Sequence, residues 1–319
     1  MTVRPVVPLI FSSLLLSFFM HDSDAAVTYE DPLVWLEDMG DAFRETNYDA
    51  TYTYFKGNIF DSVRVVHIFE KGKEEERRFN LNGENREFYR EGNEVECIHS
   101  KENRDGALAL EHGVNLGPFS SSFPERIIGA RGLYNFALLS KTRVMGRSAV
   151  QLAVSPRFND RYGYRIWIDE ESGLLLKSVL VDRGRVKEIF QIVQLRLGDV
   201  VDERELISQI PKSGFSHPLL SQRPAKKEKP VIRVNWLPSG FKSVRRRANR
   251  LHFTDGLANF SVFVDRSGSD SLPDLATSVG GTVLLTKKLK VKGHQITIVG
   301  NVPMQTAKKV AESVEPLVY

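Results

Sequence analysis

Alternation of apolar and polar residues is the dominant pattern between residues 48 and 197. The run Tyr48–Phe55 is rich in aromatic and β-branched residues, a composition that favours strands. Within it, Tyr48, Tyr52 and Tyr54 share one face. Further strands are expected at 59–70, 76–81, 86–89, 94–99, 163–168, 174–181 and 186–197. Because their connections are short, neighbouring strands are predicted to be antiparallel.

Helical patterns are fewer. Asp31 and Pro32 can cap and start a helix, and apolar residues then recur every three or four positions as far as Phe43. Residues 100–124 are polar or serine-rich and are expected to form exposed loops. Apolar residues are frequent again from 119 to 138, and this segment is expected to be helical.

The C-terminal part repeats the strand pattern on a smaller scale. Strands are predicted around 250–265, 281–291 and 294–300, with a hairpin turn at Asp255 and Gly256. After the last strand, Pro303 stands where the first turn of a helix would begin. The following apolar residues have helical spacing, so we expect a small antiparallel sheet covered by a helix.

A composition shift separates the two parts. The chain has 319 residues, enough for two domains of ordinary size. Prolines and lysines gather between 211 and 230, where missing backbone donors and like charges favour an exposed tether. The sequence predicts a first domain over 26–208, a linker over 209–230 and a second domain over 231–319.

The N-terminus has the features of a secretory signal. Arg4 precedes an apolar stretch from 6 to 20, and small residues at 23 and 25 allow cleavage after Ala25. We therefore predict a signal peptide over 1–25 and a soluble exported protein, with an uncleaved anchor as the alternative. Removing one Arg and two Asp residues changes the net charge from +4 to +5, which favours acidic partners or anionic lipids.

Catalytic and metal-binding patterns are lacking in the sequence. The seven histidines are scattered, and neither an HExxH motif nor a GxSxG motif occurs. Cys97 is the only cysteine, so an intramolecular disulfide is excluded, and its strand position predicts a buried thiol. We assign no catalytic residue, metal or cofactor.

Aromatic residues of the first domain suggest a ligand site. A strongly curved sheet with helices over its open face would enclose an apolar cavity that accepts acyl chains. Simple core packing is the usual fate of such residues, and both interpretations stay open. The candidate ligand-binding residues are Trp35, Phe43, Tyr48, Tyr52, Tyr54, Phe88, Tyr134, Phe136 and Trp167.

Basic residues of the second domain suggest a partner site. They form an arginine cluster and a stretch in which lysines alternate with apolar residues, as on one solvated face of a strand. Acidic protein segments or lipid phosphates suit such groups, an export signal argues against nucleic acid, and ordinary solubilising charge is the alternative. The candidate partner-binding residues are Arg245, Arg246, Arg247, Arg250, Lys288 and Lys290.

Two C-terminal blocks, 250–265 and 294–314, resemble the MucB/RseB family of periplasmic sigma-E regulators. A weaker similarity covers residues 164–177 and 47–48, and residues 70–117 depart most from the family. The resemblance implies an α+β, mainly antiparallel fold. Its larger domain would be an unclosed β-barrel with a helical lid, like the lipoprotein carriers LolA and LolB, and its smaller domain an antiparallel sheet with a helix.

The resemblance also implies a function without catalysis. Family members bind the periplasmic domain of a single-span anti-sigma factor, RseA or MucA, and protect it from proteolysis. Lipopolysaccharide or mislocalised lipoprotein would release it. A lipid or lipoprotein carrier of the LolA/LolB type is the second hypothesis and an exported hydrolase the third, while a homodimer is left open.

Overall fold

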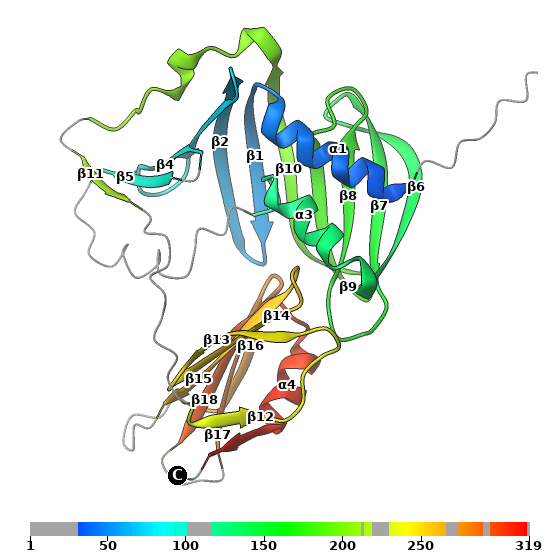
Figure 1. Cartoon of the computed structure of the whole chain (residues 1–319), viewed down its shortest axis with the longest axis vertical. Coiled ribbons are helices and arrows are strands. Elements are labelled where there is room, and N and C mark those ends of the chain that lie inside the picture. Colours follow the sequence, from blue (N-terminus) through cyan, green and yellow to red (C-terminus); the bar gives the residue numbers. More distant parts are fainter. Residues whose placement is uncertain are drawn as a thin grey trace, which may run out of the picture. The chain divides into compact units, whose positions relative to one another are not determined.

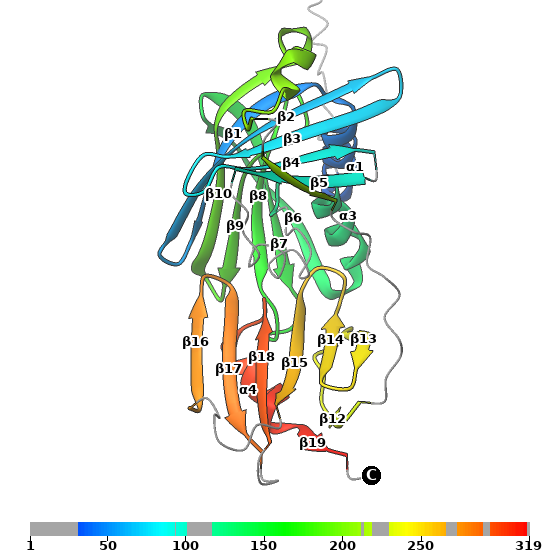
Figure 2. The same cartoon turned by 90° about the vertical axis from the view of Figure 1, so that its left-hand side faces the viewer.

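The computed structural model describes residues 31–92, 94–100, 117–211, 214–218, 230–265, 273–289 and 294–317. Over these residues the chain forms sheets of eleven, six and two strands in which every pairing is antiparallel (Figures 1 and 2). The predicted fold class is therefore confirmed. The predicted signal peptide lies outside the described residues, and none of the helices within them is long and apolar enough to span a membrane.

The large sheet has the strand order β11-β5-β4-β3-β2-β1-β10-β9-β8-β7-β6. Its two end strands, β11 and β6, do not pair with each other, so the barrel is unclosed. The strands are β1 (Tyr48–Lys56), β2 (Ile59–Glu70), β3 (Lys73–Asn80), β4 (Arg86–Glu91), β5 (Glu94–His99), β6 (Tyr134–Val144), β7 (Arg147–Pro156), β8 (Gly163–Asp169), β9 (Leu175–Asp182), β10 (Arg185–Leu197) and β11 (Phe215–Pro218).

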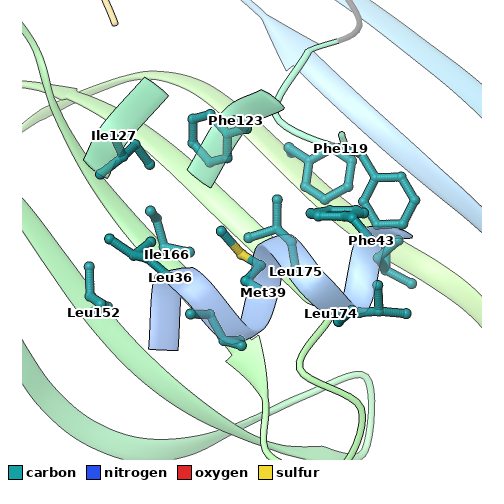
Figure 3. Packing of buried hydrophobic residues seen from close by; sticks show 14 of the residues in the cluster. Leu36, Met39, Phe43, Phe119, Phe123, Ile127, Leu152, Ile166, Leu174 and Leu175 are labelled. Carbon is teal, nitrogen blue, oxygen red and sulfur yellow. The ribbon is translucent and has the colours of Figure 1, made fainter. Parts of the chain in front are cut away.

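Two helices, α1 (Pro32–Glu45) and α3 (Ser122–Gly129), lie on one face of this sheet (Figure 1). Asp31 caps α1 as predicted, because its Oδ1 accepts a hydrogen bond of 2.9 Å from the amide of Leu33. The apolar stripes of both helices point at the sheet, where they pack in one cluster (Figure 3). The labelled members are Leu36, Met39, Phe43, Phe119, Phe123, Ile127, Leu152, Ile166, Leu174 and Leu175.

The segment 118–138 departs from the prediction in two ways. Phe119 is not in an exposed loop; it is fully buried, with its ring 4.9 Å from that of Phe43. Residues 134–138 are not helical; they are the first residues of strand β6. The side chains of Tyr134 and Phe136, two positions apart, both pack in the core. The spacing of the apolar residues changes from helical to alternating near residue 130. The prediction of one helix over the whole segment was therefore wrong beyond that point. Strand β7 was not among the predicted strands either.

Charged residues are buried beside the helices. Arg78 pairs with Glu76 at 2.7 Å and donates a 2.8 Å hydrogen bond to the carbonyl of Phe119. Burial alone would raise the pKa of Glu76, but the guanidinium groups of Arg78 and Arg90 outweigh it and hold that pKa below its ordinary value. This pair therefore fixes the chain that leads into α3.

The junction between α1 and β1 is fixed by His67, which is completely buried on β2. Its Nδ1 lies 2.8 Å from the carbonyl oxygen of Thr46, and its Nε2 lies 3.1 Å from Glu74. The imidazole also stacks on the ring of Tyr48 at 4.8 Å. Helix α1 is thus fixed to the sheet at its C-terminal end as well as through its apolar face.

The six-stranded sheet has the order β13-β14-β15-β18-β17-β16. Helix α4 (Met304–Glu312) packs against it through Ala307, Val310 and Ala311, as the sequence predicts. The predicted turn at Asp255 and Gly256 joins two paired strands. The strands are β13 (Lys242–Arg247), β14 (Arg250–Thr254), β15 (Asn259–Asp265), β16 (Leu275–Val279), β17 (Thr282–Lys288) and β18 (Gln295–Gly300), with β12 (Ile232–Val234) and β19 (Val314–Pro316) paired apart from them.

Part of the predicted linker is ordered on the large sheet. Phe215–Pro218 forms β11, which pairs with β5 so that His217 lies opposite Cys97. Cys97 is buried, as its position predicts, and burial raises the pKa of its thiol. Residues 212–213 and 219–229 of the predicted linker lie outside the described residues.

The two faces of α1 provide a test of the core. We expect Phe43→Ala to lower the free energy of unfolding by about 3–5 kcal/mol, because it removes a buried ring that Phe119 and Tyr48 both contact. Val34→Ala on the same helix removes a side chain that is 49% exposed and should cost less than about 0.5 kcal/mol. Equal losses in urea unfolding would contradict this assignment of the core.

Candidate binding cleft

A cleft of about 500 Å³ is lined by residues of both sheets. The large sheet and α3 contribute mainly aromatic and aliphatic side chains, together with Lys56, Arg126 and Glu188. The six-stranded sheet contributes mainly polar groups, together with the apolar side chains of Leu257, Phe263 and Val299. The main lining residues are Tyr54, Lys56, Phe123, Arg126, Tyr164, Leu180, Glu188 and Phe190 from the first and Arg250, His252, Leu257, Asn259, Ser261, Phe263, Thr282 and Val299 from the second.

Strand alternation explains why the smaller sheet presents this face. Leu251 and Val262 point to the buried core that α4 completes. Their neighbours Arg250 and Phe263 therefore lie on the other face, paired across β14 and β15. The Arg250 guanidinium lies 5.0 Å from the ring centre of Phe263, a cation–π contact. A cation and an aromatic ring thus share the surface of the cleft.

Glu188 joins the two sheets at one end of the cleft. Its Oε1 accepts a 2.9 Å hydrogen bond from the amide of Gly281, and its Oε2 accepts one from the hydroxyl of Tyr54. Burial, and then the charge of Glu188, raises the pKa of Tyr54, which stays a neutral donor. Gly280 and Gly281 form the two-residue turn between β16 and β17, and this turn lies against Leu180 and Lys56. Glu188 therefore docks the β16–β17 hairpin.

Arg161, between β7 and β8, docks the β14–β15 turn. Its Nη1 lies 2.6 Å from Oδ2 of Asp255, and both side chains are 0% exposed. Asp255 also accepts hydrogen bonds from the amides of Leu257 and Ala258, and Leu257 joins the core of the large sheet. Burial nevertheless raises the pKa of Asp255 above its ordinary value.

Two further hydrogen bonds support this contact. The hydroxyl of Tyr162 donates to the carbonyl of Val302 at 2.8 Å, and Thr306 donates to the carbonyl of Asp160 at 2.9 Å. Residues 160–162 therefore reach the start of α4 as well as the β14–β15 turn. The cleft is bounded by polar contacts that hold specific backbone groups of the smaller sheet.

The predicted ligand-binding aromatics are mostly core residues. Phe43, Tyr48, Tyr52 and Tyr134 are buried beneath the helices. Trp35, Tyr54 and Phe136 are partly buried against the same cluster, whereas Phe88 on β4 lies opposite Arg78. Trp167 packs in a separate cluster with Val144, Ala149 and Leu176. Of the nine, Tyr54 lines the cleft, and the acyl-binding assignment of all nine stays a prediction.

The predicted basic residues do not form one site in the described part of the chain. Arg250 lines the cleft, while Arg247 and Lys288 are exposed at strand ends. Arg245 and Arg246 belong to β13, but their side chains, like the whole of Lys290, lie outside what the structure describes. Their role in partner binding remains a prediction.

Sequence reasoning missed the charged or titratable cleft residues Lys56, Arg126, Glu188 and His252. They come from four different elements, and the antiparallel order of the large sheet alone brings Lys56 beside Glu188. One signal was available: the strand of alternating residues ends in Lys56, which lies two positions after Tyr54 and therefore on the same face. That signal is common on solvated strands and does not select a site.

Comparison with known proteins shows to which family this chain belongs. The sequence model of the MucB/RseB N-terminal domain matches residues 31–210, and that of the MucB/RseB C-terminal domain matches residues 226–315. The chain belongs to the MucB/RseB family. The resemblance found in the two C-terminal blocks is thereby confirmed and extends along most of the protein.

Individual relatives agree over nearly their whole length. The sigma factor AlgU regulatory protein MucB of Pseudomonas aeruginosa is 32% identical over 321 residues, 96% of this chain and 97% of that protein. The sigma-E factor regulatory protein RseB of Haemophilus influenzae is 28% identical, with 97% and 98% covered. Both relatives are named as regulatory proteins.

Solved structures of MucB are similar to this chain as well. A crystal structure of MucB in complex with MucA(peri) matches with a TM-score of 0.69 and 29% identity, covering 91% of this chain and 100% of that one. A crystal structure of MucB described without that partner matches with a TM-score of 0.60 and 28% identity, covering 89% and 97%.

The buried ion pair gives a test of how the sheets are joined. Arg161→Leu leaves the carboxylate of Asp255 buried without its cation, so we expect unfolding to become easier by about 3–5 kcal/mol. Arg165→Leu is the matched control, because Arg165 is exposed on β8 and should change stability by less than about 0.5 kcal/mol. The two variants are compared by chemical denaturation, and a loss confined to the control would refute the role of the pair.

Proposed function

We propose that this protein is a periplasmic negative regulator of the sigma-E type, which binds the periplasmic domain of an anti-sigma factor and protects it from proteolysis. Membership in the MucB/RseB family supports the proposal, together with the similarity to a MucB structure that contains MucA(peri). The protein is a binding protein rather than an enzyme. Among the described residues, no three His, Cys, Asp or Glu side chains are placed to hold a metal ion.

The proposed binding site is the cleft. Its aromatic and aliphatic lining offers apolar surface, and Arg126, Arg250 and Lys56, the last 3.9 Å from Glu188, offer positive charge. A peptide with apolar anchors and acidic flanks would complement both features. Docking there would also cover the contact between Glu188 and the β16–β17 hairpin, so partner binding and the spacing of the two sheets would be linked.

Lipid is the proposed releasing signal. The core beneath α1 and α3 is filled by side chains, so acyl chains would have to displace a helix or enter the cleft itself. Phe123 belongs both to that core and to the cleft lining. Lipid that moves α3 would therefore alter the partner site, and it would shift the equilibrium by its differential affinity for the released state.

A carrier of the LolA/LolB type is the alternative. It predicts that the protein collects acyl chains from one membrane and delivers them without forming a stable complex with a protein. The six-stranded sheet and its cleft would then have no assigned purpose. Recovery from the native envelope separates the two: a single-span protein that lipopolysaccharide releases favours the regulator, and lipid alone favours the carrier.

Charge reversal in the cleft tests the partner site. We expect Arg250→Glu to slow association with the purified periplasmic domain of the cognate anti-sigma factor about tenfold at low salt, because it replaces attraction by repulsion. The difference should shrink as salt is raised. Arg233→Glu, at an exposed position on β12, keeps the same net charge and controls for it. Equal association rates of the two variants in stopped-flow measurements would exclude the cleft.

Lipid competition tests the release mechanism. Saturating lipid A should weaken anti-sigma binding at least tenfold, because phosphate groups and acyl chains would occupy the cations and apolar surface of the cleft. Lipid A stripped of its phosphates, at the same acyl concentration, should compete less. Binding measured by calorimetry that is unchanged in saturating lipid A would reject lipid as the signal.

A further inference from the structure

The four end strands of the two large sheets differ in how they are protected. Open edges expose backbone groups that other chains can pair with, and proteins block them with charges, prolines or bulges. β6 carries Lys141, Arg143 and a bulge. β13 contains four basic residues and a bulge, and β11 has four residues and ends in a proline.

β16 has none of these features. Its sequence, Leu-Ala-Thr-Ser-Val, is uncharged and regular in pairing, and all five residues are exposed. Leu275 is 45% and Val279 39% exposed, although both are apolar. An uncharged, exposed edge of this kind is a template for pairing with an extended chain.

The backbone groups that β16 offers follow from its hairpin. The amide of Leu275 faces β17, because it donates to the Thr286 hydroxyl at 2.9 Å. Val279 and Thr282 are paired across the two-residue turn, so Val279 also directs its backbone groups to β17. Bonding alternates along an antiparallel ladder. Ala276 and Ser278 therefore direct their N–H and C=O groups away from the sheet.

A groove accompanies this edge on the side of α4. It has a volume of about 250 Å³ and includes Ala276, Leu285, Lys308, Ala311 and Glu312 in its lining. Ala276 lies opposite the buried Leu285, so its small side chain leaves room between the strand and the helix. Leu275, Ala276, Leu285 and Ala311 give the groove aliphatic surface, and its other lining residues are the polar or charged Asp274, Thr286, Lys287, Lys308 and Glu312.

We propose that β16 and α4 bind an extended peptide with alternating apolar side chains, which adds to the sheet as a seventh strand. Ala276 and Ser278 would supply the backbone hydrogen bonds. One peptide side chain would enter the groove, and a neighbour would cover Leu275 on the opposite face, where Val279 already lies next to Gly57 of the β1–β2 turn. This use of an edge for affinity and a groove for specificity is that of known strand-addition domains.

This site is distinct from the cleft. The groove lies on the face of the sheet that α4 covers, whereas Arg250 and Phe263 of the cleft lie on the other face. The proposal therefore does not depend on the proposed anti-sigma function, and the two can fail separately.

The experiment uses the full mature chain and an acetylated, amidated decapeptide of alternating valine and serine. The peptide should bind in fluorescence anisotropy and slow hydrogen exchange at the amides of Ala276 and Ser278 at least tenfold. N-methylation of alternate residues on one edge of the peptide should abolish binding. N-methylation on the other edge should leave it within about twofold.

Protein variants give a second test. Ser278→Pro removes one outward N–H without touching the bonds to β17, and it should weaken binding about tenfold. Ser278→Ala keeps that N–H and should bind as the unaltered protein does. Ala276→Phe fills the groove and should also weaken binding, which keeps the test valid if the proline variant does not fold.

Three results would overturn the proposal. One is an unmodified peptide that does not bind at its solubility limit. Another is a pair of N-methylated peptides that bind equally. The third is a homodimer in sedimentation that Ser278→Pro dissociates, because β16 would then be occupied by a second copy of this chain.

Discussion

An antiparallel sheet of eleven strands that does not close has to cover its concave face with something other than itself. Here α1, α3 and the segment around Phe119 provide the cover, and the apolar cluster that they complete extends across the sheet from β2 to β6. The rest of the structure depends on this packing. The entry into α3 brings Gly117, Pro118, Ser122 and Phe123 to the cleft, and Leu257 from the β14–β15 turn is added to the same cluster.

Buried charges then fix what the apolar packing leaves free. Apolar contact is non-directional, so it does not by itself set the register of a helix on a sheet. The guanidinium groups of Arg78 and Arg161 and the imidazole of His67 each contact one particular carbonyl or carboxylate. Burying such groups costs free energy unless their partners are in place. Each of these contacts therefore favours one arrangement of the packed elements over others, and this effect is larger than its net contribution to the free energy of folding.

Much of the fold could be predicted from the sequence, because alternation and helical spacing are local signals. Tyr48–Phe55, the cap at Asp31 and the strand–Pro303–helix unit all appear as predicted. The errors lie where two periods meet, as between Ile127 and Phe136, and where a polar composition conceals a buried ring, as at Phe119. A sequence window that spans both the helical and the alternating period shows neither period clearly.

The site was harder to predict, because its residues come together only through the topology. Glu188 and Gly281 are far apart in the chain, and their contact depends on the docking of one hairpin. The aromatic set illustrates the opposite case: its members do cluster, but largely as core beneath the helical lid. A sequence identifies residues that will be buried more readily than it distinguishes a filled interior from a binding cavity.

The single thiol has an experimental consequence. Cys97 lies on β5, between β4 and the short strand β11 that the predicted linker contributes, and its side chain is almost completely buried. A thiol reagent would therefore reach it only when the structure around β5 opens. Its rate of modification reports, without any introduced probe, how often this end of the large sheet opens.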